Sequence, residues 1–382
     1  MIPFNKPFLT GKELKYINQA NNLGQLAGDG YFTNACKKWL EKNTSTCYAL
    51  LTHSCTAALE MAAILADIKE GDEIIMPSFT FVSTANAFAL RGGKPIFVDI
   101  NPLTLNIDVK LIEKAITHKT KAIVPVHYSG FGCDMEEILN IARENNLLVI
   151  EDAAQGIMSK YKGKALGNIG DLGCYSFHET KNIFAGEGGA LLINNRQFIE
   201  RAEFIREKGT NRSSFNRGIT DKYTWVDIGS SFLPGELTAA FLLAQMENAE
   251  KITKERLKIW NFYHNGLKEY SKNGIVSIPI NQEDRLHNGH IFYLIHQTNF
   301  KRDLFIKKMS KKGVMVVFHY IPLHLSPYSR KVYNTDNLKL PFTESIYKRL
   351  SRIPIWLGID KELVLEKIIE SLKEIENECK TN

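Results

Sequence analysis

The chain has 382 residues, of which 44% are hydrophobic and 24% charged, as in an ordinary globular protein with room for two domains and a large core. Its net charge is +6, and the basic residues are spread along the chain, which argues against nucleic acid as a partner. Six cysteines without a C-x-x-C pair argue against a zinc or redox motif. We therefore expect a reduced, cytoplasmic protein.

Neither the first residues nor the apolar stretches predict contact with a membrane. Residues 1–7 lack the apolar segment of a signal peptide. Residues 74–90 are the most apolar stretch, but Pro77 and several hydroxyl side chains interrupt them, so we do not expect a membrane span.

Up to about residue 250, after an arm and a first helix in residues 1–30, short apolar runs alternate with helical patterns. The predicted strands are 48–51, 73–76, 95–98, 122–126 and 147–150, and the predicted helices 33–42, 57–66, 79–90 (loop and helix), 108–117 and 135–144. This alternation predicts a mostly parallel sheet with helices on both faces. A ligand site is then expected where the carboxyl ends of the strands meet.

After about residue 246 the pattern changes. Residues 246–263 predict a long charged helix that acts as a connector. Strand-like runs follow at 291–295 and 314–318, with helices flanking the second run, and a last helix is predicted at 361–376. We therefore expect an arm and large domain in residues 1–250 and a smaller α+β domain in residues 251–382.

Lys181 follows a strand-like run at 174–177 and precedes a glycine-rich return, 186–189, into a further apolar run. Most lysines are solvated surface charges. In a partly desolvated position at a strand end, however, a lysine can have a lowered pKa and form an imine with a carbonyl compound. Both interpretations remain open from these residues alone.

Asp152 directly follows the apolar run 147–150. A carboxylate there is often a turn residue or a helix cap. The functional alternative is a charge partner for a pyridinium nitrogen, which keeps such a ring protonated as an electron sink. Gln155, three residues further on, is then placed to hydrogen-bond a substituent of the ring.

Residues 54–57 begin a predicted helix and are either an ordinary N-cap or an anion site made of backbone N–H groups and hydroxyls. The chain has neither a P-loop nor a G-x-G-x-x-G motif, so a single phosphate is a better candidate than a nucleotide cofactor. Phe79 and Phe81 are either core residues or, for Phe81, a ring that stacks on a flat cofactor.

His287 and His290 have a metal-like spacing, but no further ligands lie near them, so we expect no metal site. The cluster 319–324, which contains His319, Tyr320 and His324, either faces the cleft and contacts the substrate or forms a polar turn.

Five motifs occur in order along nearly the whole chain: Gly28-x-Gly30-x-x-Thr33, residues 54–59, residues 77–84, residues 151–155, and residues 176–182 followed by 186–189. Together they resemble the pyridoxal-phosphate-dependent sugar aminotransferases of the DegT/DnrJ/StrS family. The resemblance implies an aspartate-aminotransferase-like (fold type I) large domain with a mostly parallel central sheet and a smaller C-terminal α+β domain.

The resemblance also assigns roles to residues, with pyridoxal 5'-phosphate as the cofactor. It implies that Lys181 is the catalytic residue and forms the covalent link, while Asp152 pairs with the ring nitrogen. Gln155 is implied at the ring hydroxyl, and Phe81 on the ring face. The phosphate contacts implied are Cys55, Thr56 and Ser176, with Ser231 from the partner subunit at a position that is often Asn in the family. A homodimer with shared sites follows.

Residues 2–5, 206–213, 221–225 and 318–324 resemble more closely the branch of the family that makes dTDP-4-amino-4,6-dideoxygalactose for enterobacterial common antigen. This implies amino transfer from L-glutamate to the 4-keto group of dTDP-4-keto-6-deoxyglucose. Lys208, Arg212, Tyr320 and His324 are the expected substrate contacts, and Arg217 is a further basic candidate.

Two alternatives remain: a related enzyme that aminates C3 or makes the gluco epimer, and a non-catalytic regulatory protein on the same fold. The presence of Lys181, which a dehydratase branch replaces with histidine, favours transamination. Residues 233–236 and Phe184 depart from the usual family pattern.

Overall fold

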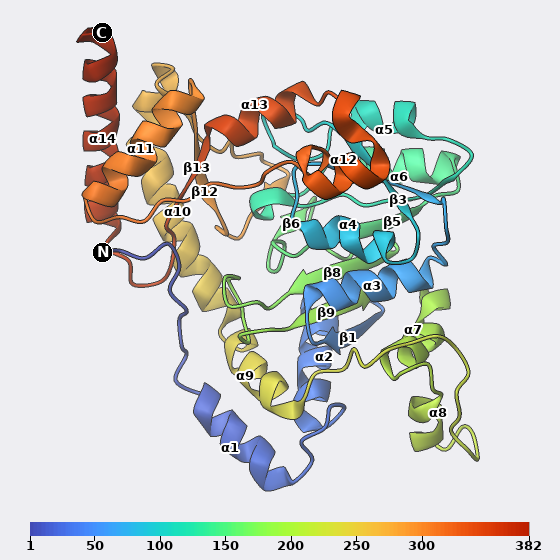
Figure 1. Cartoon of the computed structure of the whole chain (residues 1–382). Coiled ribbons are helices and arrows are strands. Elements are labelled where there is room, and N and C mark those ends of the chain that lie inside the picture. The colour runs from blue at the N-terminus through green and yellow to red at the C-terminus, as the bar shows by residue number, and fades with distance from the viewer. Residues whose placement is uncertain (382) are drawn as a thin grey trace.

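A seven-stranded sheet with helices on both faces forms the centre of the computed structural model, which describes residues 1–381 (Figure 1). Its strands, in spatial order, are β1 (Tyr48–Thr52), β9 (Gly189–Ile193), β8 (Leu172–Ser176), β5 (Leu148–Asp152), β4 (Thr120–Ile123), β2 (Glu73–Pro77) and β3 (Lys94–Val98). Strand β9 runs antiparallel to both of its neighbours, β1 and β8, and the pairs from β8 to β3 are parallel. The predicted mostly parallel sheet is confirmed.

Side chains of successive strand residues point to opposite faces, and both faces are buried. Leu50 lies in a core with α3 (Cys55–Leu65) and α7 (Ile199–Arg206), while Ala49 and Leu51 lie in a core on the other face. That second core contains α2 (Tyr31–Thr44) and α9 (Glu236–Met246); α5 (Val109–Ala115) and α6 (Met135–Glu144) cover the other half of the same face. The remaining helices here are α1 (Glu13–Leu23), α4 (Val82–Ala89) and α8 (Arg212–Asn216).

The C-terminal part contains its own antiparallel sheet of β10 (Val276–Ser277), β12 (Phe292–His296) and β13 (Leu350–Ile353). The helices α10 (Ala249–Lys272), α11 (Asn299–Lys311) and α14 (Lys361–Thr381) enclose a separate core around Trp260, Phe305 and Ile368. The short helices α12 (Pro327–Tyr333) and α13 (Pro341–Arg349) lie between α11 and β13 in the chain. Helix α10 links both parts, because Ile252 packs in the core of α2 and α9 while Trp260 packs in the C-terminal core (Figure 1).

The run 314–318 was expected to be a strand, but it forms only single bridges, between Val314 and Ile2 and between Val317 and Arg352. The reason is that β13 takes the place beside β12, where it pairs over four residues. The N-terminal arm therefore contacts the C-terminal part, and the Trp356 indole donates to the Pro3 carbonyl at 3.0 Å.

A third, small sheet pairs β11 (Arg285–Leu286) with β6 (Lys160–Tyr161), and β6 with β7 (Lys164–Ala165). Its two-residue strands are too short to leave an alternating sequence pattern. Across residues 1–381, no helix is both long and apolar enough to cross a membrane.

Candidate active site

Lys181 lies in the loop between β8 and β9, where its backbone N–H donates to His178 at 2.9 Å. Burial lowers the pKa of its ammonium group, and the positive charge of Arg352 acts in the same direction, while Cys55 and Asp152 act against it. Groups at the end of β5 and at the start of α3 therefore act electrostatically on the Lys181 amine, which follows β8. An amine that is neutral more often than usual is suited to forming an imine and accepting a proton.

Asp152 ends β5 and is 5% exposed. Its Oδ2 accepts a hydrogen bond from the Thr84 hydroxyl at 2.6 Å, and its Oδ1 accepts one from the Ala154 backbone at 3.1 Å. These two donors fix the orientation of the Asp152 carboxyl group at the base of the site. The turn-residue interpretation does not explain the buried bond to Thr84, which lies 68 residues away in sequence.

The start of α3 has a side-chain cap and the free N–H groups that an anion site would need. The Ser54 hydroxyl accepts from the Ala57 backbone at 3.0 Å, while the remaining N–H groups of the first turn have no partner inside the helix. Gly189 lies against this turn, since a Cβ there would be 2.4 Å from the Ser54 carbonyl carbon. The expected phosphate contacts Cys55 and Thr56 are in this turn, and Ser176 lies buried at the end of β8, beside Gly189.

Gln155 and Tyr320 meet although they are 165 residues apart. Gln155 accepts a hydrogen bond from the Ser129 backbone at 2.6 Å and donates one to the Tyr320 hydroxyl at 3.2 Å. The Phe81 ring is 57% exposed, and its centroid lies 6.4 Å from that of Tyr320. Phe79, in contrast, is 1% exposed and packs in the core. The structure thus brings Tyr320 of the C-terminal part against the residues expected around a flat ring.

His324 was expected to contact substrate, but it is fully buried. Its Nδ1 lies 2.7 Å from the Ser78 hydroxyl and its Nε2 lies 3.4 Å from Glu344. Because protein partners take both ring nitrogens, the side chain joins the loop after β2 to α13 and offers nothing to a ligand.

Lys208, Arg212 and Ser231 line one pocket of about 300 Å³ together with Asp29 and Glu207. Lys208 and Arg212 are exposed, and their nitrogens lie 3.6 and 3.9 Å from the Glu207 carboxylate. The structure does not place this pocket around Lys181, whose neighbours are different residues. We call the pocket lined by Glu207, Lys208, Arg212 and Ser231 the basic pocket, after its two exposed cations.

The guanidinium of Arg217 is already engaged. It donates to both oxygens of Glu203, at 2.8 and 2.7 Å. Arg217 is therefore less available to an anionic ligand than Lys208 or Arg212.

Arg352, which no sequence pattern indicated, lies beside the candidate site and contacts His319 of the cluster 319–324. Arg352, in the unpredicted strand β13, donates to His319 Nδ1 at 2.9 Å, and His319 Nε2 lies 2.8 Å from the Tyr128 hydroxyl. Since arginine can only donate, Nδ1 is the acceptor and Nε2 carries the proton. Burial and the charge of Arg352 hold the pKa of His319 well below its usual range, so the ring is neutral.

The two histidines with metal-like spacing have other partners. His287 stacks on Phe131 with centroids 4.4 Å apart, and His290 Nδ1 lies 2.9 Å from Asn182. Within the described residues, no group of three or more metal-ligating side chains comes together.

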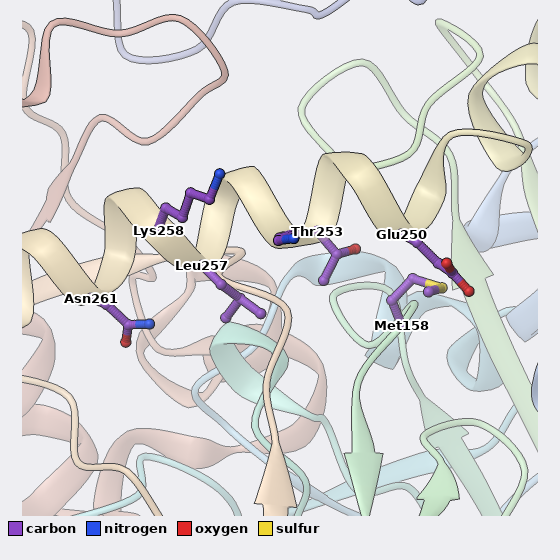
Figure 2. A pocket seen from close by; sticks show the side chains of 7 residues that line it. Met158, Glu250, Thr253, Leu257, Lys258 and Asn261 are labelled. Atoms are coloured by element: carbon purple, nitrogen blue, oxygen red, sulfur yellow. The ribbon is translucent and has the colours of Figure 1, made fainter.

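A second pocket, of about 430 Å³, lies along α10 (Figure 2). Its lining combines the apolar side chains of Met158 and Leu257 with polar and charged ones, among them Glu250, Thr253 and Lys258 (Figure 2). None of the residues expected to hold the cofactor lines it.

Comparison with known proteins identifies the class. The DegT/DnrJ/EryC1/StrS aminotransferase family model matches residues 7–373, and the chain belongs to this family. It is therefore a sugar aminotransferase that depends on pyridoxal 5'-phosphate.

Two relatives and one solved structure show how far the similarity extends. GDP-perosamine synthase of Escherichia coli is 31% identical over 374 residues, with 98% of each chain covered. Spore coat polysaccharide biosynthesis protein SpsC of Bacillus subtilis is 30% identical and covers 98% of this chain and 97% of its own. The structure of NtdA from Bacillus subtilis, with its bound cofactor PMP, is 28% identical with a TM-score of 0.86, over 97% of this chain and 87% of that one.

Proposed function

We propose that this aminotransferase moves an amino group from L-glutamate to the 4-keto group of dTDP-4-keto-6-deoxyglucose, giving dTDP-4-amino-4,6-dideoxygalactose and 2-oxoglutarate. The observation that carries the chemistry is the Lys181 amine, whose pKa is lowered by burial, in electrostatic contact with the buried Asp152 carboxylate. The choice of sugar rests on residues 206–213 and 318–324 and their resemblance to one branch of the family.

The residues around Lys181 fit pyridoxal phosphate. When bound, the cofactor supplies an electron sink for the negative charge formed at the reacting carbon. Asp152 would hold the ring nitrogen, Gln155 would bind the ring hydroxyl, and Phe81 would cover one face. Cys55 and Thr56 in the first turn of α3, with Ser176, would hold the phosphate; burial raises the pKa of the Cys55 thiol well above its usual range and keeps it neutral.

Lys181 moves the proton in both half-reactions. Its neutral amine takes the proton from Cα of glutamate and later delivers a proton to C4 of the sugar. Tyr320, hydrogen-bonded to Gln155, borders the space where the sugar ring enters. Which face of the sugar meets Lys181 decides between the galacto and gluco products.

We further propose that the functional unit is a homodimer. The basic pocket carries two exposed cations and Ser231. It lies outside the group of Lys181, Asp152 and Cys55 of its own chain, which we call the Lys181 cluster. In the dimer it faces the site of the partner, where Ser231 contacts the cofactor phosphate and Lys208 and Arg212 pair with the nucleotide diphosphate.

The test is to incubate the enzyme with L-glutamate and dTDP-4-keto-6-deoxyglucose and to determine the product by NMR. A 4-amino sugar with the galacto configuration is expected. A gluco product, or faster turnover of a GDP-linked keto-sugar, would contradict the assigned sugar but leave amino transfer intact. Absence of 2-oxoglutarate with every keto-sugar would instead favour a non-catalytic protein on this fold.

A further inference from the structure

The first turn of α4 touches three parts of the proposed cofactor site at once. Phe81 is the residue before the helix and presents the exposed ring. Ser83 accepts a hydrogen bond from the Thr56 hydroxyl at 2.8 Å, at the phosphate end. Thr84 donates to Asp152 at 2.6 Å, at the end where the ring nitrogen is held. One helical turn therefore connects the two ends of the site.

The direction of the hydrogen bonds around Thr84 follows from simple chemistry. A carboxylate can only accept, so the single Thr84 proton points at Asp152 Oδ2. Thr80, whose hydroxyl lies 2.8 Å from that of Thr84, must then be the donor in their shared bond. The result is a directed chain from Thr80 through Thr84 to Asp152.

This chain is shielded from water. Thr80 is 2% exposed, Thr84 0% and Asp152 5%. A buried hydroxyl that donates to a charged group contributes more than a neutral pair does, because water cannot replace it. With Ala154 on Oδ1 and Thr84 on Oδ2, the carboxylate is fixed in rotation and still has lone pairs for a ligand N–H.

We propose that Thr84 is a positioning residue, which orients the Asp152 carboxyl group toward the ring nitrogen, and that Ser83 in the same turn holds the Thr56 side chain at the phosphate end. The inference rests on the proposed function, because it assumes that Asp152 and Thr56 hold opposite ends of the cofactor. It assigns separable tasks to two adjacent hydroxyls.

The matched variants are Thr84→Val, which keeps the shape and removes the hydroxyl, and Thr84→Ser, which keeps the hydroxyl. The probe is pyridoxamine 5'-phosphate, which binds without a covalent bond to Lys181. Its Kd for the apoprotein is measured by fluorescence titration at neutral pH, in the wild-type and Lys181→Ala backgrounds, with melting temperatures as a check of folding.

In Thr84→Val the Asp152 carboxyl group has lost the donor that fixes its orientation, so the Kd is expected to be about tenfold weaker. Thr84→Ser keeps the hydroxyl and is expected to match the wild type. Ser83→Ala, at the phosphate end, is expected to weaken binding by a similar factor.

An unchanged Kd in a folded Thr84→Val protein, or a Thr84→Ser protein that binds as weakly as Thr84→Val, overturns the proposal while leaving cofactor binding intact. If Thr84→Val does not fold, Thr80→Val is expected to weaken binding by a smaller factor, and an unchanged Kd for Thr80→Val contradicts the hydrogen-bonded chain from Thr80 to Asp152. If the wild type does not bind pyridoxamine phosphate at all, the proposed function fails together with this inference.

Discussion

The Lys181 cluster and the basic pocket contain most of the residues expected to act, but they are built differently. Around Lys181, the carboxylate is buried and held by Thr84 and the Ala154 backbone. In the basic pocket, Lys208 and Arg212 are exposed cations near Glu207. The first site is held by hydrogen bonds within its own chain, whereas the second exposes its two cations. Under the proposed function, the reaction chemistry and the choice of substrate therefore depend on separate regions.

The largest expected effect comes from removing the amine. Lys181→Ala should lose at least about 1,000-fold in turnover, because it removes the general base and the covalent attachment together. The rate of 2-oxoglutarate release measures it, and the near-visible absorbance of the bound cofactor should disappear. A variant that kept full glutamate turnover would remove Lys181 from the mechanism.

The difference between the Lys181 cluster and the basic pocket predicts that the two regions act together across subunits. Arg212→Ala should raise the KM for the nucleotide sugar about tenfold and leave the glutamate half-reaction unchanged. When Arg212→Ala and Lys181→Ala chains are mixed and exchange partners, about a quarter of the sites should regain both residues, as symmetry requires.

Sites built within one chain would give no such recovery. The rescued fraction is measured as turnover at a sugar concentration below the wild-type KM, where the two parent variants are both slow. The control is a mixture of each variant with itself.

A smaller effect is expected where the backbone must pass close to α3. In Gly189→Ala, the added Cβ would lie 2.4 Å from the Ser54 carbonyl carbon. Overpacking of this kind costs about 1–3 kcal/mol of stability, and the displaced turn should also bind the cofactor phosphate more weakly. Gly186→Ala is not a matched control because Gly186 has a positive φ, whereas Gly188→Ala has only contacts of 3.3 Å or more. Equal melting temperatures and cofactor affinities for the two variants would contradict the close approach.

The smallest effect concerns the free energy of unfolding, which burial of the Lys181 amine lowers. Since the pKa of Lys181 is lowered in the folded state, the unfolded chain binds more protons between that lowered value and 10.5. Stability from this group therefore rises with pH through that window. Lys181→Met should raise the melting temperature of the apoprotein by about 1–2 °C at neutral pH, and the gain should shrink as the pH approaches 10.5. A gain in melting temperature that does not depend on pH would contradict burial of the amine as its cause.

Sequence patterns predicted the large sheet and the positions of Lys181 and Asp152, because strand ends in a parallel sheet must gather at one edge. They did not predict the role of Thr84, since its bond to Asp152 depends on how α4 approaches β5 and not on local composition. Strand β13 was missed for a related reason: residues 314–318 are more apolar, but residues 350–353 occupy the place beside β12. His324 resembled a substrate contact, yet Ser78 and Glu344 bind both its nitrogens.

The central claim is that Lys181 holds pyridoxal phosphate while Asp152 faces the ring nitrogen. Borohydride reduction of the holoenzyme, followed by proteolysis and mass spectrometry, tests it most directly. We expect one phosphopyridoxyl group per chain, on the peptide that contains Lys181, and none when the enzyme is first converted to its amino form with glutamate. Attachment at another lysine, or no attachment at all, would contradict the account.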